Sequence, residues 1–283
     1  CHPYDRAGPH KDIVAQRLSA LSRLKDLCVD SNLVVLTTVN AVMQRVAPPG
    51  LFDGRLLHLK KGSRIGTNDL QSFLIENGFL RVDTVGEPGE FAVRGGILDI
   101  YPSNAELPLR LDFFGDELER IRPFNPLTQI SEGNSPDFTL MPVNEFILDE
   151  ASKGRFRTRY REIFATTGIG DPLYEAVSEG RLYQGMEHWL PLFHERMDTV
   201  FDYLPESAVI TLDPRFDEVR KTRLETISDF YQARQQAPVI ETKSFSDSGR
   251  YHALPPNALY LSEAECLERL EQFSCGQLYE FAA

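Results

Sequence analysis

The segment 90–116 constrains the fold of this chain most strongly, because apolar and polar residues alternate along its second half. Apolar side chains stand at every second position from Leu107 to Phe113, and the positions between them include Arg110 and Asp112. A period of two predicts a β-strand that buries one face and leaves the other solvated. The sequence therefore predicts a sheet with one polar surface in this part of the chain.

Phe114 follows on the solvated side of this strand, where a polar residue is expected. An aromatic ring next to an arginine on such a face favours a docking surface over a catalytic cleft. In the alternative interpretation, Phe114 ends the strand and folds under the turn that follows. Single exposed apolar residues are common on protein surfaces, so the alternation alone leaves both interpretations open.

Length and charge limit the class of protein. The chain has 283 residues, enough for about two domains, and a formal net charge of −12. This charge disfavours a general nucleic-acid binder, because the phosphate backbone would repel the protein. It suits a basic partner, and it equally suits plain solubility. With no apolar run of about 18 residues and no secretory leader, we expect a cytoplasmic protein that contacts no membrane.

Turn residues divide the chain into an insert and its flanks. A short helix is expected over 67–78, and residues 79–124 carry strand and turn signals, so residues 63–136 are expected to form a small α+β insert with an antiparallel sheet. Gly95 and Gly96 shift the alternation within it and predict a β-bulge. The flanks have α/β character. We expect a helix over 9–27, and the run LVVLTTV at 33–39 predicts a parallel strand buried on both faces.

The motifs of common enzyme classes are missing from the sequence. It has no GxxxxGK[ST] phosphate loop, no HExxH and no GxSxG. Glu187, His188 and His194 could be drawn as a metal set, but their spacing matches no ligand pattern, so structural histidines are expected. We therefore expect no catalytic residue, no metal and no cofactor, and this favours a binding module.

Cysteines and a basic run have plain structural interpretations. The four cysteines show no CxxC spacing, so we expect free thiols and no zinc; they are Cys1, Cys28, Cys266 and Cys275. In the basic run at 153–161, arginines alternate with aromatic residues, as in a nucleic-acid strip. On a helix, the aromatics would instead face inward and the arginines would spread over the solvated side, which is the interpretation we favour.

Two longer motifs make the chain resemble a known family. EFAVRGGILDIYP and LPLRLDFFGDELERIRPFNPLTQIS resemble the motif that bacterial UvrB shares with the transcription-repair coupling factor, Mfd. Three flanking features favour the Mfd family: PHKDIVAQRLSAL, VNAVMQRV closely followed by LHLKKG, and YQGMEHWLPLF followed by VFDYLPESAVI. The resemblance runs over nearly the whole chain.

The resemblance implies an α/β fold with a split first domain. Domain 1 would be RecA-like, a degenerate relative of the P-loop NTPases without a functional ATP site. A small α+β domain 2 with an antiparallel sheet would be inserted into it. The expected parts are domain 1a at 1–56, domain 2 at 57–137 and domain 1b at 138–283. The chain would then begin inside domain 1a and leave an open edge on domain 1.

The resemblance also implies a partner and the residues that bind it. In the family, UvrA is bound by the arginine of the VRG motif and by the arginine and phenylalanine of the RLDFF motif. In this sequence these are Arg94, Arg110 and Phe114, and Asp112 lies on the same strand face. The implied function is a non-catalytic, UvrA-recruiting module that links stalled RNA polymerase to nucleotide excision repair.

Further partners would belong to the full-length protein. A C-terminal domain would mask the UvrA-binding face at rest, and RNA polymerase and DNA would be contacted by later domains of an ATP-dependent DNA translocase. The alternative is a UvrB-like fragment of an ATP-dependent repair enzyme that binds damaged DNA.

Overall fold

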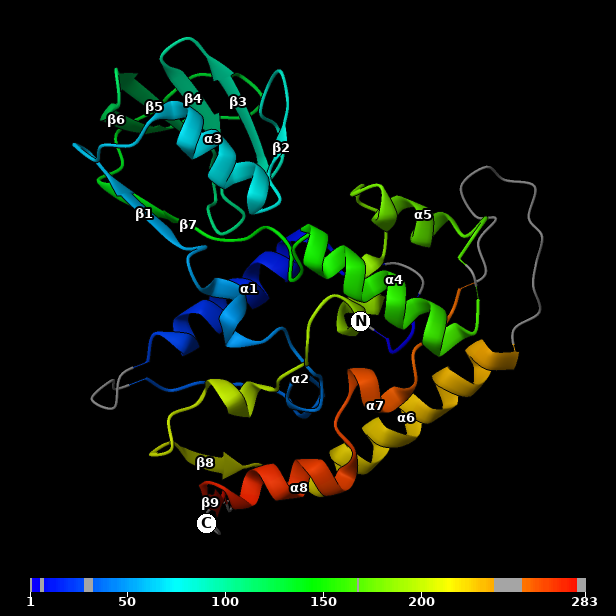
Figure 1. Cartoon of the computed structure of the whole chain (residues 1–283). Helices are drawn as coiled ribbons and strands as arrows, with labels where there is room; N and C mark the ends of the chain where they lie inside the picture. Colours follow the sequence, from blue (N-terminus) through cyan, green and yellow to red (C-terminus); the bar gives the residue numbers. More distant parts are fainter. Residues whose placement is uncertain (1, 6–7, 28–32, 167, 237–250, 279–283) are drawn as a thin grey trace. The chain divides into compact units, whose positions relative to one another are not determined.

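The computed structural model describes residues 2–5, 8–27, 33–166, 168–236 and 251–278. The chain divides into two compact units (Figure 1). The sheet unit consists of Pro9–Ser22 and Gly50–Asp149, and the helical unit consists of Cys1–Gly8, Arg23–Pro49 and Glu150–Ala283. Helices occur together with antiparallel, parallel and mixed sheets, so the fold is of the mixed α/β type.

A five-stranded sheet with the strand order β2-β3-β4-β5-β6 forms the centre of the sheet unit. Its neighbours are antiparallel, except that β2 and β3 are parallel. The strands are β2 (Leu80–Arg81), β3 (Glu90–Arg94), β4 (Ile97–Ile100), β5 (Leu109–Phe114) and β6 (Glu117–Pro123). A separate antiparallel pair joins β1 (Leu57–Lys60) to β7 (Asp137–Leu140). The predicted antiparallel sheet is therefore present, with one parallel pair at its edge.

Helix α3 (Thr67–Glu76) packs against the five-stranded sheet and closes its core (Figure 1). Leu70 of α3 and Leu111 of β5 are fully buried in the same cluster, and Phe113 packs against it. Burying a leucine side chain stabilises the fold by about 1.5–3 kcal/mol. The predicted buried face is thus confirmed along β5. It starts later than expected, because Leu107 precedes the strand and is exposed.

The glycine pair at 95–96 forms a hairpin turn, so the predicted bulge at this place is wrong. Arg94 pairs with Ile97 across the turn, which leaves only two residues between β3 and β4. Gly95 has a φ of +62°, a left-handed conformation that two-residue hairpin turns require and that glycine adopts without steric cost.

A β-bulge is found in β6 instead. Phe113 pairs with Leu118, but the preceding residue of β5 pairs with Arg120, so Glu119 is left without a register partner. Because of this extra residue, both Leu118 and Ile121 reach the core although they are three positions apart. The sequence conceals the bulge, since no glycine marks it.

The helical unit contains a two-stranded parallel sheet and most of the helices. β8 (Val209–Leu212) pairs in parallel with β9 (Ser274–Gln277). The chain between them forms α6 (Phe216–Gln236), α7 (Pro256–Leu259) and α8 (Glu263–Glu271), and parallel neighbours need such a crossover. The remaining helical elements of the chain are α1 (Lys11–Lys25), α2 (Val39–Val42), α4 (Glu150–Phe164), α5 (Pro172–Ser178) and the 3₁₀ helices η1 (Pro49–Phe52), η2 (Met186–Leu192) and η3 (Val200–Tyr203). Helix α1 confirms the helix predicted over 9–27.

The strand predicted at 33–39 is wrong. Residues 33–38 form no regular element, and Val34 and Leu36 are 83% and 92% exposed. A parallel strand buried on both faces needs a neighbouring strand and covering layers on both faces. In the described part of the helical unit, the parallel sheet consists of β8 and β9, and neither pairs with residues 33–38. The run instead lines an open, mainly apolar pocket of about 800 Å³ together with η3 and β8.

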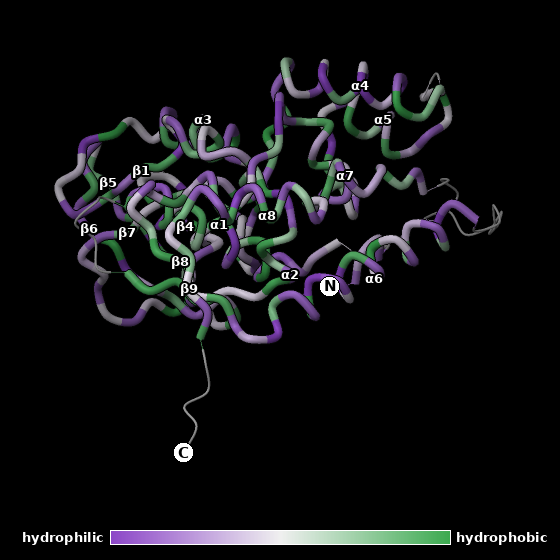
Figure 2. The backbone as a smooth tube through the Cα atoms, turned by 90° about the horizontal axis from the view of Figure 1, so that it is seen from below, coloured by the Kyte–Doolittle hydropathy of each residue, from purple (hydrophilic) through white to green (hydrophobic). Residues whose placement is uncertain are grey.

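Helix α4 explains the basic run at 153–161. Its Phe156 and Tyr160 are fully buried, as predicted for an amphipathic helix. Figure 2 shows hydrophilic stretches along α4 interrupted by hydrophobic ones. Arg155 donates to the carbonyl of Phe193 at 2.9 Å, so part of the run is used in holding the helix to the unit.

Candidate protein-docking surface

The side chains singled out in the sequence lie on the face of the five-stranded sheet that is opposite the α3 cluster, which we call the outer face. The pleat places there the residues that alternate with buried ones. Two rows of register partners cross the strands on this face: Ala92, Asp99, Arg110 and Arg122 form the first row, and Arg94, Ile97, Asp112 and Arg120 form the second. Phe114 follows Asp112 by two residues and shares its face. The structure therefore brings the four predicted residues onto one surface.

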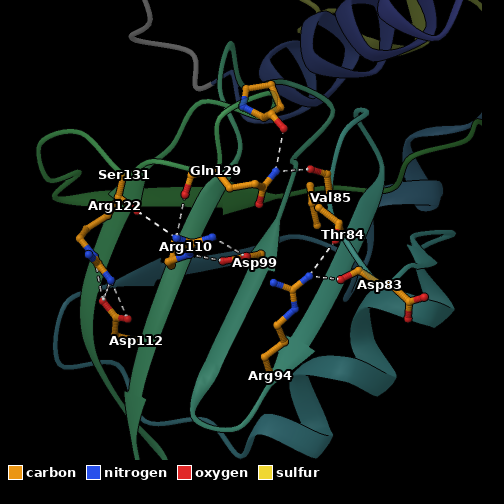
Figure 3. Close-up of polar contacts among 11 residues, drawn as sticks. Asp83, Thr84, Val85, Arg94, Asp99, Arg110, Asp112, Arg122, Gln129 and Ser131 are labelled. Atoms are coloured by element: carbon orange, nitrogen blue, oxygen red, sulfur yellow. Dashed lines mark hydrogen bonds and ion pairs between the residues drawn. The ribbon is translucent and has the colours of Figure 1, made fainter.

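Arg110 is held by a bidentate ion pair with Asp99 of β4 (Figure 3). Its Nε and Nη2 donate to the two carboxylate oxygens at 2.7 and 2.8 Å. Its Nη1 donates to the carbonyl of Gln129 at 3.2 Å, and the guanidinium lies 4.7 Å from the ring centroid of Phe124. The hydrogen bond to Asp99 raises the pKa of Arg110, whose side chain is 18% exposed. Arg110 thus builds the surface and offers a partner little free charge.

Asp112 is neutralised by a second bidentate pair on the same face. Arg122 of β6 donates to its carboxylate through Nε and Nη2, both at 2.9 Å (Figure 3). Both side chains are half-buried. The ion pair of Asp112 therefore links β5 to β6, and Asp112 presents no net negative charge to a partner.

Arg94 differs from the two paired arginines. It is exposed at the end of β3 and donates through Nη2 to the carbonyl of Asp83 and, at 2.8 Å, to Oγ1 of Thr84 (Figure 3). Both acceptors are uncharged, and no carboxylate pairs with Arg94 among the residues that the structure describes. These two bonds orient the side chain while its positive charge stays available.

Phe114 is exposed over 78% of its surface, so the interpretation in which it folds under the following turn is wrong. It ends β5 and pairs with Glu117 across the hairpin turn. Arg94 and Phe114 belong to hairpins that lie side by side, because Phe113 donates to the carbonyl of Gly96 at 2.8 Å. An exposed aromatic ring and a charged arginine therefore share this face, on strands that are separated by β4.

Two segments cover one end of the outer face and leave the other end open. Residues 82–85 and 125–131 lie over a small buried cluster that contains Ala92 and Phe124. Gln129 ties the segments together, because its Nε2 donates to the carbonyls of Val85 at 3.1 Å and Pro126 at 2.7 Å. Its backbone has a φ of +61°, which is uncommon for a residue other than glycine. The open end carries Phe114 and its neighbours, and Arg94 lies at its border, where its guanidinium binds residues 83 and 84 of the first segment.

The residues that form this surface match a known protein family. The family described as UvrB interaction domain matches residues 57–146, which include the whole five-stranded sheet. A transcription-repair-coupling factor of Escherichia coli is 35% identical over 280 residues, and one of Haemophilus influenzae is 37% identical over 273 residues. These matches cover 98% and 96% of this chain. The chain belongs to the transcription-repair-coupling factor family.

The matched region is a limited part of the transcription-repair-coupling factors. The chain spans 23% of the length of the Escherichia coli protein and 22% of the Haemophilus influenzae protein. A transcription-repair-coupling factor of Bacillus subtilis is 29% identical over 218 residues, which are 71% of this chain. All four predicted residues lie inside the UvrB interaction domain of this family member.

Two further residues of the open end, Ile97 and Arg120, were not identified from the sequence of this transcription-repair-coupling factor family member. Ile97 is 38% exposed, and Arg120 is exposed. The alternation within β4 could have placed Ile97 on the same face as Asp99. Arg120 could not be placed in this way, because the bulge at Glu119 interrupts the period of two.

No metal-ligand cluster accompanies this surface within the described residues, where no three His, Cys, Asp or Glu side chains are grouped to hold an ion. His188 instead packs edge-on against Trp189 and Tyr251. Among the same residues, no helix combines the length and the apolar character needed to cross a membrane. Cys266 and Cys275 are free thiols, and Cys1 and Cys28 lie outside the described residues.

Proposed function

We propose that the outer face of the five-stranded sheet recruits UvrA. The observation that carries this proposal is that an exposed Phe114 shares the face with Arg94, an arginine whose charge is not neutralised. An exposed aromatic ring has no role in the core of its own unit. Aromatic and arginine side chains are the residue types that contribute most to protein interfaces.

The residues of the surface would have different roles in binding. Phe114 would enter an apolar pocket on UvrA, and Arg94 would pair with a carboxylate of the partner. Arg110 and Asp112 would hold the strands in register through their own ion pairs and contribute at the edges of their exposed surface. Two side chains then supply most of the binding energy, and the paired charges supply the rigid support.

The biological role follows from the family. The relatives are named transcription-repair-coupling factors, and we propose that this chain serves as their non-catalytic UvrA-recruiting part. It would link stalled RNA polymerase to nucleotide excision repair. RNA polymerase and DNA would be contacted by other parts of an ATP-dependent DNA translocase, one of which would mask the outer face at rest.

The same family argument extends to the fold. We propose a degenerate RecA-like domain 1 with parts at 1–56 and 138–283, interrupted by domain 2 at 57–137; the helical unit makes up most of this domain 1. The parallel pair of β8 and β9, joined through α6, α7 and α8, supports this assignment, because parallel pairs with helical crossovers are typical of α/β domains.

The test compares a surface variant with a matched control. The variant combines Arg94→Ala with Phe114→Ala, and the control combines Arg81→Ala with Ile75→Ala, which are also an exposed arginine and an exposed apolar residue of the sheet unit. Isothermal titration calorimetry with purified UvrA measures the dissociation constant. We expect a loss of at least about 30-fold for the surface variant, as for an interface hot spot, and no change for the control.

Arg110 is left out of this variant because its removal would leave Asp99 buried and unpaired, so a folding defect could imitate a binding defect. The melting temperatures of both variants should match that of the unchanged chain. Equal UvrA affinity for the surface variant and the control would overturn the proposed function.

A further inference from the structure

The open end of the outer face contains a second apolar residue beside Phe114. Ile97 of β4 pairs in register with Asp112 of β5, and Phe114 lies two residues further along the same strand face. Diagonal neighbours of this kind are about 7–8 Å apart, which is within reach of an aromatic side chain. Ile97 and Phe114 therefore form one apolar area at the open end.

Arginines stand on both sides of this apolar area. Arg94 of β3 and Arg120 of β6 are the two ends of the second row, and Ile97 and Asp112 lie between them. Three strand spacings, or about 14 Å, separate the backbone positions of the two arginines. Asp112 is neutralised by Arg122, whereas neither Arg94 nor Arg120 has a carboxylate partner in the part of the chain that the structure describes.

The bulge in β6 is what places Arg120 on this surface. Leu118 and Ile121 both point into the core, and the two residues between them, Glu119 and Arg120, are both exposed. Arg120 takes the register position opposite Asp112, while Glu119 has no register partner. Bulges commonly redirect a side chain at the edge of a sheet in this way.

We propose that Ile97 and Arg120 are further binding residues, and that with Phe114 and Arg94 they form a docking surface for an acidic protein segment that carries an apolar side chain. This inference rests on the proposed function and describes the segment of UvrA that would be bound. The apolar side chain packs on Ile97 and Phe114, and carboxylates on either side of it pair with the two arginines.

A protein segment fits this surface better than a nucleic acid. Two arginines on strands about 14 Å apart match two separate carboxylates, whereas a nucleic-acid strand needs a continuous basic groove. Glu119 lies next to Arg120, and the Gly115–Asp116 turn and Glu117 border Phe114. A strand with a phosphate at every nucleotide would meet these carboxylates, whereas a protein segment can carry its own carboxylates only opposite the two arginines.

The experiment separates the apolar and the ionic contributions by salt. Ile97→Thr, which keeps a β-branched residue in the strand, and Arg120→Ala are compared with the matched control Arg81→Ala. UvrA affinity is measured by calorimetry at about 0.05 M and about 0.5 M NaCl. We expect Ile97→Thr to weaken binding about fivefold at both salt concentrations, and Arg120→Ala to weaken it about fivefold only at the lower one.

The single variant Phe114→Ala is measured in the same series. If it weakens UvrA binding while Ile97→Thr and Arg120→Ala behave like the control, the inference on these two residues is wrong and the proposed function stands. If all three variants bind UvrA like the control, the proposed function fails as well. Binding of single-stranded DNA that is lost in the Arg120→Ala variant would overturn the choice of a protein segment.

Discussion

Arg110 shows that a side chain can belong to a binding surface and still act mainly as support. Its guanidinium is shared between Asp99, Gln129 and the ring of Phe124, so most of its donors are already used. Arg94 has the same side chain but only uncharged acceptors. The sequence does not distinguish the two arginines, because both are charged residues expected on the surface. The difference between them comes from the partners that the neighbouring strand and loop supply.

This contrast gives a prediction for Asp99, which is buried beneath Arg110. Asp99→Asn leaves the guanidinium partly buried without a negative partner and should lower the free energy of unfolding by about 2–3 kcal/mol. Urea unfolding followed by circular dichroism measures the change. Asp137→Asn, at an exposed carboxylate of β7, is the matched control and should change stability by less than about 0.5 kcal/mol. A change below about 0.5 kcal/mol for both variants would show that the Asp99–Arg110 pair contributes little to the stability of the fold.

The elements of the sheet unit are placed by their turns and by one bulge. The hairpin at Gly95 brings Arg94 next to Ile97, and the bulge at Glu119 turns Arg120 outward. In the helical unit, the run at 33–38 shows the opposite case, in which strong strand propensity produces no strand. Propensity describes a residue in a pleated, half-buried environment, and here the neighbouring strands that would create this environment are absent from the described residues.

The exposed run gives a prediction at the scale of the element. Leu36→Ser replaces an apolar side chain that is almost fully exposed, so the free energy of unfolding should change by less than about 0.5 kcal/mol. The same substitution at the buried Leu261 of this unit should cost about 2–5 kcal/mol or more, because it leaves a cavity and buries a hydroxyl. Urea midpoints of the two variants check both values. A large cost at Leu36 would mean that the run is buried in solution.

At the scale of the whole molecule, the chain consists of two units, each with its own core. The sheet unit buries one cluster between α3 and the sheet, while clusters of the helical unit gather around residues such as Phe201 and Ile227. The single tryptophan of the chain, Trp189, is buried in the helical unit. Its fluorescence therefore reports the unfolding of one unit only.

This arrangement allows the independence of the units to be tested. Leu111→Ala opens a cavity in the core of the sheet unit and should destabilise that unit by about 2–5 kcal/mol. Hydrogen exchange of the amides of β4 and β5 should accelerate accordingly, while the urea midpoint of Trp189 fluorescence stays unchanged. An equal shift of the fluorescence midpoint would show that the two units unfold together.

Several features could be predicted from local patterns, and others could not. Helix α1, the buried face of β5 and the inward aromatics of α4 follow from the spacing of apolar residues along one element. The glycine pair at 95–96 predicts a bulge where the structure has a hairpin turn, because a glycine pair is compatible with both. The true bulge carries no local signal. The alternation of residues also leaves the exposure of Phe114 open, because the chain at the end of a strand can turn toward the core or toward solvent.

The sequence by itself determined which residues of β5 face the core and which face away, and it determined the family, because both follow from the order of residues along the chain. Only the tertiary structure decided that Arg110 is paired while Arg94 is not, that Phe114 is exposed, and that Ile97 and Arg120 adjoin it. The physical reason is that a side chain's partners are set by the register between strands. That register depends on turns, bulges and loops that lie elsewhere in the chain.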